Sequence, residues 1–179
     1  MLYLVILSLV TLVACLLSNW YAAQRAKHAS WPKIVDSVHD HIPPIPKWIP
    51  ELLMILPVVY LVLSCQWTWL SRGAEIYLWM LLFKCVFVHA TVLPSIDRNC
   101  DRPFFTLGNC NDYMFSGHTV LVTVAALAAM SAGLWSPAMA GLYVMVTMIA
   151  ITAARNHYFV DTLVAALFTV AVWKSTCPH

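Results

Sequence analysis

The stretch YMFSGHTVLVTVAALAAMSAGLWSPAMAGLYVMVTMIAITAA, residues 113–154, contains no Asp, Glu, Lys or Arg. It is too long for one membrane-crossing helix, which needs about 17–25 residues. The segment SAGLWSP, residues 131–137, holds the glycine and proline that typically separate two helices. The stretch therefore predicts two consecutive apolar helices, over residues 117–132 and 137–154, joined by a short turn.

The composition of the whole chain agrees with a membrane protein. The 179 residues are 61% hydrophobic and 10% charged, with a mean hydropathy of +0.77. A soluble domain carries about 25% charged residues. We expect an integral membrane protein with residues 1–179 in a single domain. A net charge of +2, with no basic stripe interleaved with aromatics, argues against nucleic-acid binding.

Four further apolar runs predict helices over residues 2–18, 52–70, 76–93 and 158–173. Together with the first two, they predict an all-α polytopic protein with six transmembrane helices in one bundle. Residues 71–74, SRGA, read as the tight turn between the second and third helices. Residues 2–18 could also be a cleaved signal peptide. Because the run has no basic residues at its start and is followed by only a poor cleavage site, we favour a retained helix.

The polar segment of residues 19–50 contains five prolines, which exclude a long regular helix over its second half. We expect it to lie along the membrane surface, with a short amphipathic piece at residues 34–42. With six spans, this segment, the loop at 95–116 and the corner at 155–157 all face one side. His118 and His157 therefore fall at the same membrane face. The basic residues on that side favour a cytosolic site, although a phosphate site also recruits cations.

Two motifs in this apolar chain carry ionisable groups: SGHT, residues 116–119, and HYFVD, residues 157–161. Ionisable groups in membrane segments are costly and usually functional. On a helix, His157 and Asp161 would share a face, so the carboxylate could orient the ring and raise its basicity. This pattern suits His157 as a nucleophile toward phosphorus and His118 as a general acid toward the leaving oxygen. Backbone N–H groups at Ser116 and Gly117 could bind phosphate at a helix start.

Further candidates for headgroup or phosphate binding are Arg155, Lys84, Asp112 and Tyr113. Each motif alone has a simpler reading, since interfacial histidines and helix-start ion pairs are common. Lys84 could equally pair structurally, and Arg155 could anchor the interface. Cys100 and Cys110 share a loop that could hold a disulfide in an oxidising lumen, with two free thiols as the alternative. No acidic cluster at ligand spacing predicts a metal, and we expect no cofactor.

The segments CNDYMFSGHT, residues 110–119, and HYFVD resemble the third and fourth signature motifs of sphingomyelin synthases. Those enzymes and the inositol phosphorylceramide synthases are similar to the type-2 phosphatidic acid phosphatase superfamily. The segment IVDSVHDHIPPIP resembles the first motif. Lys84 with the following LP at 93–94 resembles the second, although the family usually has Arg at the position of Lys84. The resemblance covers roughly residues 30–170.

The resemblance implies six helices and a catalytic triad of His118, His157 and Asp161. It implies transfer of a phospho-headgroup (phosphocholine, phosphoinositol or phosphoethanolamine) from a glycerophospholipid to ceramide, with release of diacylglycerol. It also implies a lumenal or exoplasmic site in the Golgi, endoplasmic reticulum or plasma membrane, against the charge bias, and we follow it. The run ARNHY, residues 154–158, is closer to the plant and protozoan inositol phosphorylceramide synthases.

Two departures and two alternatives remain. The loop between Pro94 and Cys110 is shorter than in animal sphingomyelin synthases, and no cytosolic N-terminal domain precedes the first span. The same triad would serve a lipid phosphate phosphatase that uses water as acceptor. A non-catalytic membrane scaffold is the third reading. The sequence leaves open whether the chain forms a homo-oligomer.

Overall fold

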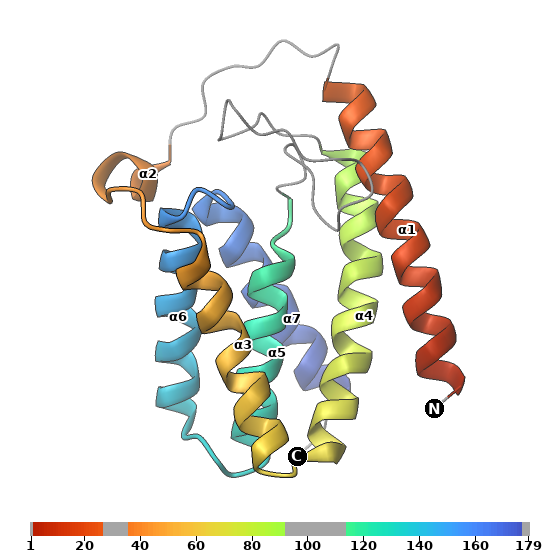
Figure 1. Ribbon diagram of the computed structural model, residues 1–179, viewed down its shortest axis with the longest axis vertical. Coiled ribbons are helices and arrows are strands. Elements are labelled where there is room, and N and C mark those ends of the chain that lie inside the picture. The colour runs from red at the N-terminus through yellow and green to blue at the C-terminus, as the bar shows by residue number, and fades with distance from the viewer. Residues whose placement is uncertain (1, 27–35, 92–113, 177–179) are drawn as a thin grey trace.

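The computed structural model describes residues 2–26, 36–91 and 114–176. These residues form helices and no strand, which confirms the predicted all-α class for the described part of the chain. The helices are α1 (Leu2–Ala26), α2 (Ser37–His41), α3 (Trp48–Leu63), α4 (Trp67–Ala90), α5 (Gly117–Ser131), α6 (Pro137–Ala153) and α7 (Phe159–Thr176). All except the short α2 run roughly along the long axis, and the start of α1 and the end of α7 lie at the same end (Figure 1).

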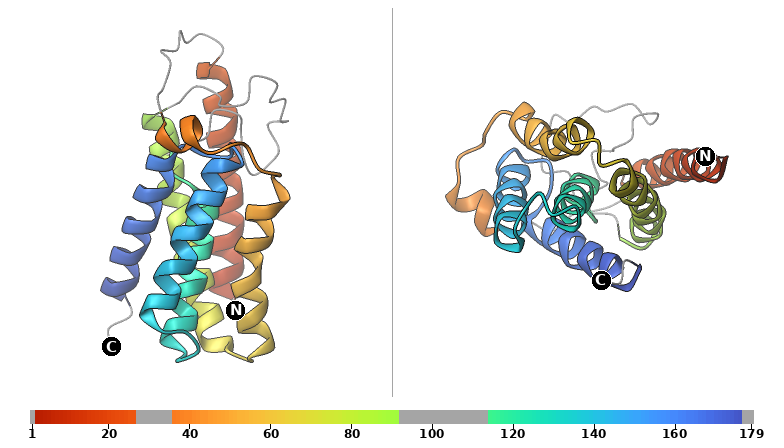
Figure 2. Two further views of the ribbon diagram at one scale, coloured as in Figure 1. Left: turned by 90° about the vertical axis from the view of Figure 1, so that its left-hand side faces the viewer. Right: turned by 90° about the horizontal axis from the view of Figure 1, so that it is seen from below.

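Helix α5 forms the centre of the bundle. It packs against α3, α4, α6 and α7, whereas α1 packs against α4 at the edge, as the view along the bundle shows (Figure 2). Nine residues of α5 are buried, and all nine are alanine, valine or threonine. These small and β-branched side chains let four neighbours approach closely, as is common between membrane helices. The SGHT motif therefore begins a helix that is enclosed on several sides.

The outer surface of the bundle is apolar. Helices α1, α4 and α7 are long and apolar enough to cross a membrane, and α3, α5 and α6 are shorter apolar helices. Large apolar side chains face outward, among them Leu9 (58% exposed), Leu142 (67%) and Leu167 (64%). Exposed apolar surface on this scale needs a lipid or protein environment. These features support an integral membrane protein.

The predicted turn at residues 71–74 is wrong, because α4 continues unbroken through it. A Cβ added at Gly73 would lie 3.0 Å from Cγ1 of Val124, so this glycine permits close packing of α4 on α5. The chain instead reverses just after α3, where Cys65 has a φ of 55°. The second and third helices thus occupy 48–63 and 67–90, in place of the predicted 52–70 and 76–93.

The predicted turn between residues 131 and 137 is confirmed. Gly133 adopts a φ of 72°, in the left-handed region that glycine tolerates best. The Ser136 side chain then accepts a hydrogen bond from the Met139 N–H at 3.2 Å, and Pro137 is the first residue of α6. Both helices end within one residue of their expected bounds. By contrast, α1 extends to Ala26, well beyond the expected end at residue 18.

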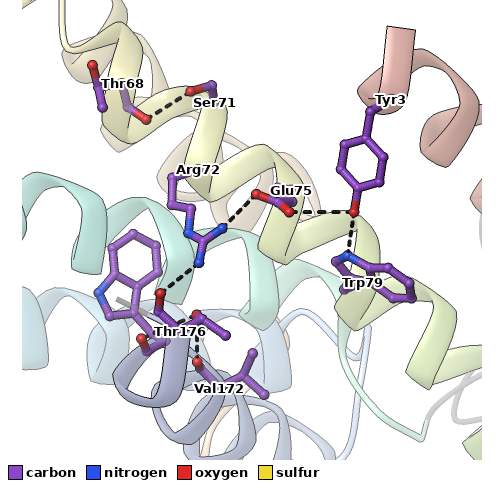
Figure 3. Close-up of polar contacts among 9 residues, drawn as sticks. Tyr3, Thr68, Ser71, Arg72, Glu75, Trp79, Val172 and Thr176 are labelled. Carbon is purple, nitrogen blue, oxygen red and sulfur yellow. Dashed lines mark hydrogen bonds and ion pairs between the residues drawn. The ribbon is translucent and has the colours of Figure 1, made fainter. Parts of the chain in front are cut away.

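A polar network joins three helices at the end of the bundle where α1 begins and α7 ends (Figure 3). Arg72 of α4 donates to the Glu75 carboxylate at 2.8 Å and to the Thr176 carbonyl of α7 at 2.7 Å. The Tyr3 hydroxyl of α1 donates to Glu75 at 3.5 Å and accepts a hydrogen bond from the Trp79 ring N–H at 3.1 Å. We call this set of residues the far-end network.

An apolar cavity of about 140 Å³ lies between α3, α4 and α5. Its walls include Leu61, Trp69, Tyr77, Leu121, Val124 and Ala128. Tyr77 and Leu121 form its limit toward the end of the bundle that carries the SGHT motif. The start of α5 lies only about one helical turn beyond Leu121, or roughly 6 Å at 1.5 Å per residue.

Candidate active site

The two motif histidines, His118 at the start of α5 and His157 in the loop between α6 and α7, lie next to each other with their rings edge to face. Their ring centroids are 5.7 Å apart, with an interplanar angle of 66°. His118 is in the first turn of α5, which begins where the fully buried Ser116 side chain accepts a hydrogen bond from the Thr119 N–H at 3.2 Å. His157 is 4% exposed. The fold thus brings the two imidazoles together, as the motif pattern led us to expect.

Asp161 lies in the first turn of α7 and is fully buried. Its carboxylate accepts a hydrogen bond from the Tyr158 N–H at 3.2 Å, and its carbonyl accepts one from the Ser116 N–H at 3.4 Å. The second bond ties the start of α7 to the start of α5. His157 precedes α7, however, so the two residues do not lie on one helix, and orientation of the His157 ring by the Asp161 carboxylate stays a prediction.

Lys84 of α4 points toward the start of α5. Its Nζ lies 3.9 Å from the position that a Cβ on Gly117 would occupy. The Lys84 ammonium group therefore lies beside the helix start, at a distance where an added Cβ would make only ordinary van der Waals contact. A cation next to the N–H groups of a helix N-terminus favours an anion. Phosphate binding by Lys84, Ser116 and Gly117 stays a prediction, and the Ser116 N–H already bonds to the Asp161 carbonyl at 3.4 Å.

Arg155 follows α6 in an unusual backbone conformation. The Asn156 N–H bonds to the Ile151 carbonyl at 3.2 Å and the Arg155 N–H to the Thr152 carbonyl at 2.9 Å, the pattern of a Schellman helix end. This motif usually places glycine where Arg155 stands, and Arg155 has a φ of 61°. A non-glycine residue there costs about 1–2 kcal/mol.

The Arg155 side chain is directed toward the segment around α2. Its Nη2 donates to the carbonyls of His39 at 2.8 Å and Ile42 at 3.1 Å. Its Nη1 is buried and has no hydrogen-bond partner among the residues that the structure describes. The two bonds of Nη2 connect the end of α6 to the segment around α2, which is distant in sequence. Phosphate binding by Arg155 stays a prediction.

Two residues that we did not single out from the sequence, Asp36 and His39, also lie at this corner. The Asp36 carboxylate accepts hydrogen bonds from Val38, His39 and, at 2.6 Å, from the Phe159 N–H that begins α7. Asp is a favoured helix N-cap residue, but Asp36 lies inside the predicted amphipathic piece of residues 34–42, so the sequence signal for its cap was present but was not used. Its bond to α7 has no such signal, because it joins distant segments.

The His39 ring packs against this corner as well. Its Nε2 donates to the Thr152 carbonyl at 3.1 Å, and its ring lies 5.6 Å from the Tyr158 ring. Burial lowers the pKa of His39 below its usual value, and the Arg155 guanidinium lowers it further, while Asp36 acts in the opposite direction. The neutral imidazole is thus the form that fits this position.

Some sequence predictions fall on residues outside the described ranges. Asp112, Tyr113, Cys100 and Cys110 are among them, so their expected roles stay predictions. Within the described ranges, no group of three or more His, Cys, Asp or Glu side chains could hold a metal ion.

Comparisons with known proteins agree with the motif resemblance. The family model described as PAP2 superfamily C-terminal matches residues 109–177. A phosphatidylinositol:ceramide inositolphosphotransferase of Trypanosoma cruzi is 32% identical over 119 residues, which cover 54% of this chain and 35% of that protein. The protein of the same name from Leishmania major is 27% identical over 123 residues, 55% of this chain and 36% of the relative.

A plant protein, Protein PHLOEM UNLOADING MODULATOR of Arabidopsis thaliana, is 39% identical over 70 residues, 38% of this chain and 17% of its own length. The chain thus spans about a third or less of the length of these curated relatives. The region that the family model matches, residues 109–177, contains both histidine motifs. These matches make the chain similar to the PAP2 superfamily C-terminal model and to curated phosphatidylinositol:ceramide inositolphosphotransferases.

Proposed function

We propose that this protein is a sphingolipid synthase that transfers a phospho-headgroup from a glycerophospholipid to ceramide. The observation that supports this most directly is the pair of imidazoles, His118 and His157, whose ring centroids are 5.7 Å apart, together with the full burial of Asp161. Two histidines can serve the two tasks that covalent phosphoryl transfer needs, attack on phosphorus and proton transfer to oxygen. Lys84 of α4, whose ammonium group lies beside the start of α5, adds positive charge that would stabilise a phosphate diester.

The proposed cycle has two displacements. An imidazole nitrogen of His157 attacks the donor phosphorus, the bond to the diacylglycerol oxygen breaks, and His118 gives that oxygen a proton. The headgroup phosphate is then covalently bound to His157. Neutral His118 next takes the proton of the ceramide primary hydroxyl, whose oxygen attacks phosphorus and breaks the P–N bond. Both histidines return to their starting states, and no metal enters the cycle.

Phosphatidylinositol is the donor that we favour over phosphatidylcholine and phosphatidylethanolamine. Two matched relatives carry the name phosphatidylinositol:ceramide inositolphosphotransferase. The ARNHY run points to the same group of synthases. The apolar cavity between α3, α4 and α5, one turn below the site, suits a lipid acyl chain whose phosphate lies near Lys84.

We infer a topology of six membrane spans, formed by all helices except α2, in one domain over residues 1–179. In support, these helices alternate in direction along the bundle axis (Figure 2). The central α5 is enclosed by protein, so its 15 residues need not match the full lipid thickness. We infer further that the histidines face the lumen or exterior of a Golgi, endoplasmic reticulum or plasma membrane.

The test uses purified full-length protein in detergent or liposomes with fluorescent ceramide. Phosphatidylinositol, phosphatidylcholine and phosphatidylethanolamine, each labelled in the headgroup, are supplied in separate reactions. A ceramide phosphodiester that carries the label, with release of diacylglycerol, is the expected result, and it should be largest with phosphatidylinositol.

Two other outcomes separate the alternatives. Release of a water-soluble phosphate product without any ceramide product would indicate a phosphatase that uses water as acceptor. No turnover of any donor, under conditions where a control synthase is active, would exclude both enzymes and favour a scaffold.

A further inference from the structure

Residues 36–45, which we call the strap, lie across the corner between α6 and α7. Figure 2 shows α2 beside the upper end of α6, and the Ile45 N–H bonds to the Ala153 carbonyl at 3.3 Å. The strap is anchored at its first residue, Asp36, which is 8% exposed. The strap therefore forms one wall of the region that contains His157.

A single carboxylate caps two helices at this point. Oδ1 of Asp36 accepts the N–H groups of Val38 and His39, at 3.0 and 3.1 Å, and so starts α2. Oδ2 accepts the Phe159 N–H at 2.6 Å and so starts α7. Phe159 is two residues after His157. A charged acceptor on a backbone N–H makes a stronger hydrogen bond than a neutral one.

In a second contact, the loop that carries His157 reaches back to the strap. Arg155, two residues before His157, donates to the carbonyls of His39 and Ile42 in the strap. The residues on both sides of His157 are therefore bonded to the same segment. Arg155 keeps this contact despite the left-handed backbone conformation that it adopts. Strained positions of this kind often mark functional sites.

We propose that Asp36 is a positioning residue for His157. By holding the first N–H of α7, it fixes the loop that carries the His157 imidazole opposite His118. Asp36 acts through the backbone and does not touch the reacting atoms. This inference rests on the proposed function for its consequence in turnover, but the contact itself can be tested without activity.

The first test compares Asp36→Asn with Asp40→Asn in the full-length protein. Asparagine has one acceptor oxygen, so it keeps one helix cap and presents N–H groups to the other. Asp40 is an exposed carboxylate of the same helix and controls for loss of charge. We expect Asp36→Asn to lower kcat by about 10- to 100-fold with little change in KM, because small misplacements of reacting groups are costly. Asp40→Asn should retain near-normal kcat.

The second test removes the donor instead of the acceptor. Proline is tolerated at the first position of a helix, so Phe159→Pro deletes this N–H without interrupting α7. If the proposed bond carries the effect, Asp36→Asn should lower kcat by less than about threefold in the Phe159→Pro background. An equal loss in both backgrounds, or a loss no larger than that of Asp40→Asn, would overturn the proposal.

Hydrogen–deuterium exchange over residues 155–162 provides the readout that needs no activity. We expect the Asp36→Asn substitution to raise exchange there at least several-fold, while exchange in the middle of α5 stays the same. If no donor is turned over, the proposed function fails, and this measurement still decides the inference. Unchanged exchange over residues 155–162 would refute it.

Discussion

Helices α5 and α6 both end in a Schellman motif, at opposite ends of the bundle. The residue in the left-handed conformation differs between the two motifs. In α5 the Leu134 N–H bonds to the Ala129 carbonyl at 2.9 Å, and the left-handed residue is Gly133. In α6 the corresponding residue is Arg155. Glycine adopts this conformation at little cost, whereas arginine does not. The difference indicates that the α6 end keeps a side chain for its contacts.

The two ends of the bundle also differ in how deeply their polar side chains are buried. The far-end network joins partly exposed groups, with Arg72 and Glu75 at 35% and 28% exposure of their side chains (Figure 3). At the site end, Ser116 and Asp161 are fully buried, and the side chain of each accepts a hydrogen bond from a backbone N–H. Buried polar groups are costly unless satisfied, so their presence at this end supports the proposed site, whereas the partly exposed far-end network needs no such role.

The largest expected effect comes from the two histidines. We expect His157→Ala to reduce turnover below detection, because the covalent acceptor of phosphate is lost. His118→Ala should lower kcat by about 10²–10⁴-fold, the range for removal of a general acid–base group. Both are measured with the labelled donor and ceramide, and thermal unfolding of the purified variants serves as the folding control. Near-normal turnover of His157→Ala would refute its role as nucleophile.

A matched pair of substitutions tests the comparison of the helix ends. Gly133→Ala forces a side chain into the left-handed region and should lower the free energy of unfolding by about 1–2 kcal/mol without changing kcat. Arg155→Gly relieves that strain but removes both hydrogen bonds to the strap, and we expect kcat to fall at least about tenfold. Chemical denaturation and turnover are measured on both variants. Equal kcat for Arg155→Gly and wild type would remove the functional meaning of the difference.

The sequence predicts the helices well where the signals are local. The break between α5 and α6 follows from Gly133 and Pro137, and the apolar runs alone predict the all-α class. Position 73 shows where local reading fails, because its glycine serves contact with Val124 instead of a turn. The actual reversal uses Cys65 in a left-handed conformation, for which no residue preference gives a signal.

In the candidate site, too, some residues are recognisable from local sequence and others only from long-range contacts. His118, His157 and Asp161 are recognisable from their motifs, and Ser116 from its place before a helix. Asp36 becomes visible only when the chain brings the strap onto α7, since its bond to Phe159 joins segments 123 positions apart. We expect the loop geometry at His157 to depend on this long-range contact. The sequence also does not reveal that α7 begins only at Phe159, after His157.

A pH effect should distinguish the site end from the far end. The pKa of His39 is lowered in the folded protein by burial, so the folded state binds this proton less readily than the unfolded chain. Its stabilising contribution is therefore present above about pH 6.5 and is lost as the pH falls below this value. We expect the unfolding temperature to fall less between pH 7.5 and 5.5 in His39→Gln than in wild type. Identical pH dependence would contradict the role of neutral His39.

The smallest effect is expected at the far-end network. Arg72→Ala removes the ion pair with Glu75 and the bond to Thr176, which are both partly exposed. We expect a loss of about 0.2–1 kcal/mol in the free energy of unfolding and unchanged kcat. Denaturant titration and the transfer assay on this variant check both statements. A large loss of kcat would show that the two ends are coupled.

The most direct test of the account is detection of the covalent intermediate. Purified protein is incubated with inositol-labelled phosphatidylinositol and no ceramide, quenched in alkali, which preserves phosphohistidine, and digested for mass spectrometry. The account predicts labelled phosphoinositol on His157, absent from His157→Ala and discharged when ceramide is added before the quench. Ceramide-dependent product formation without any label on His157 would contradict it.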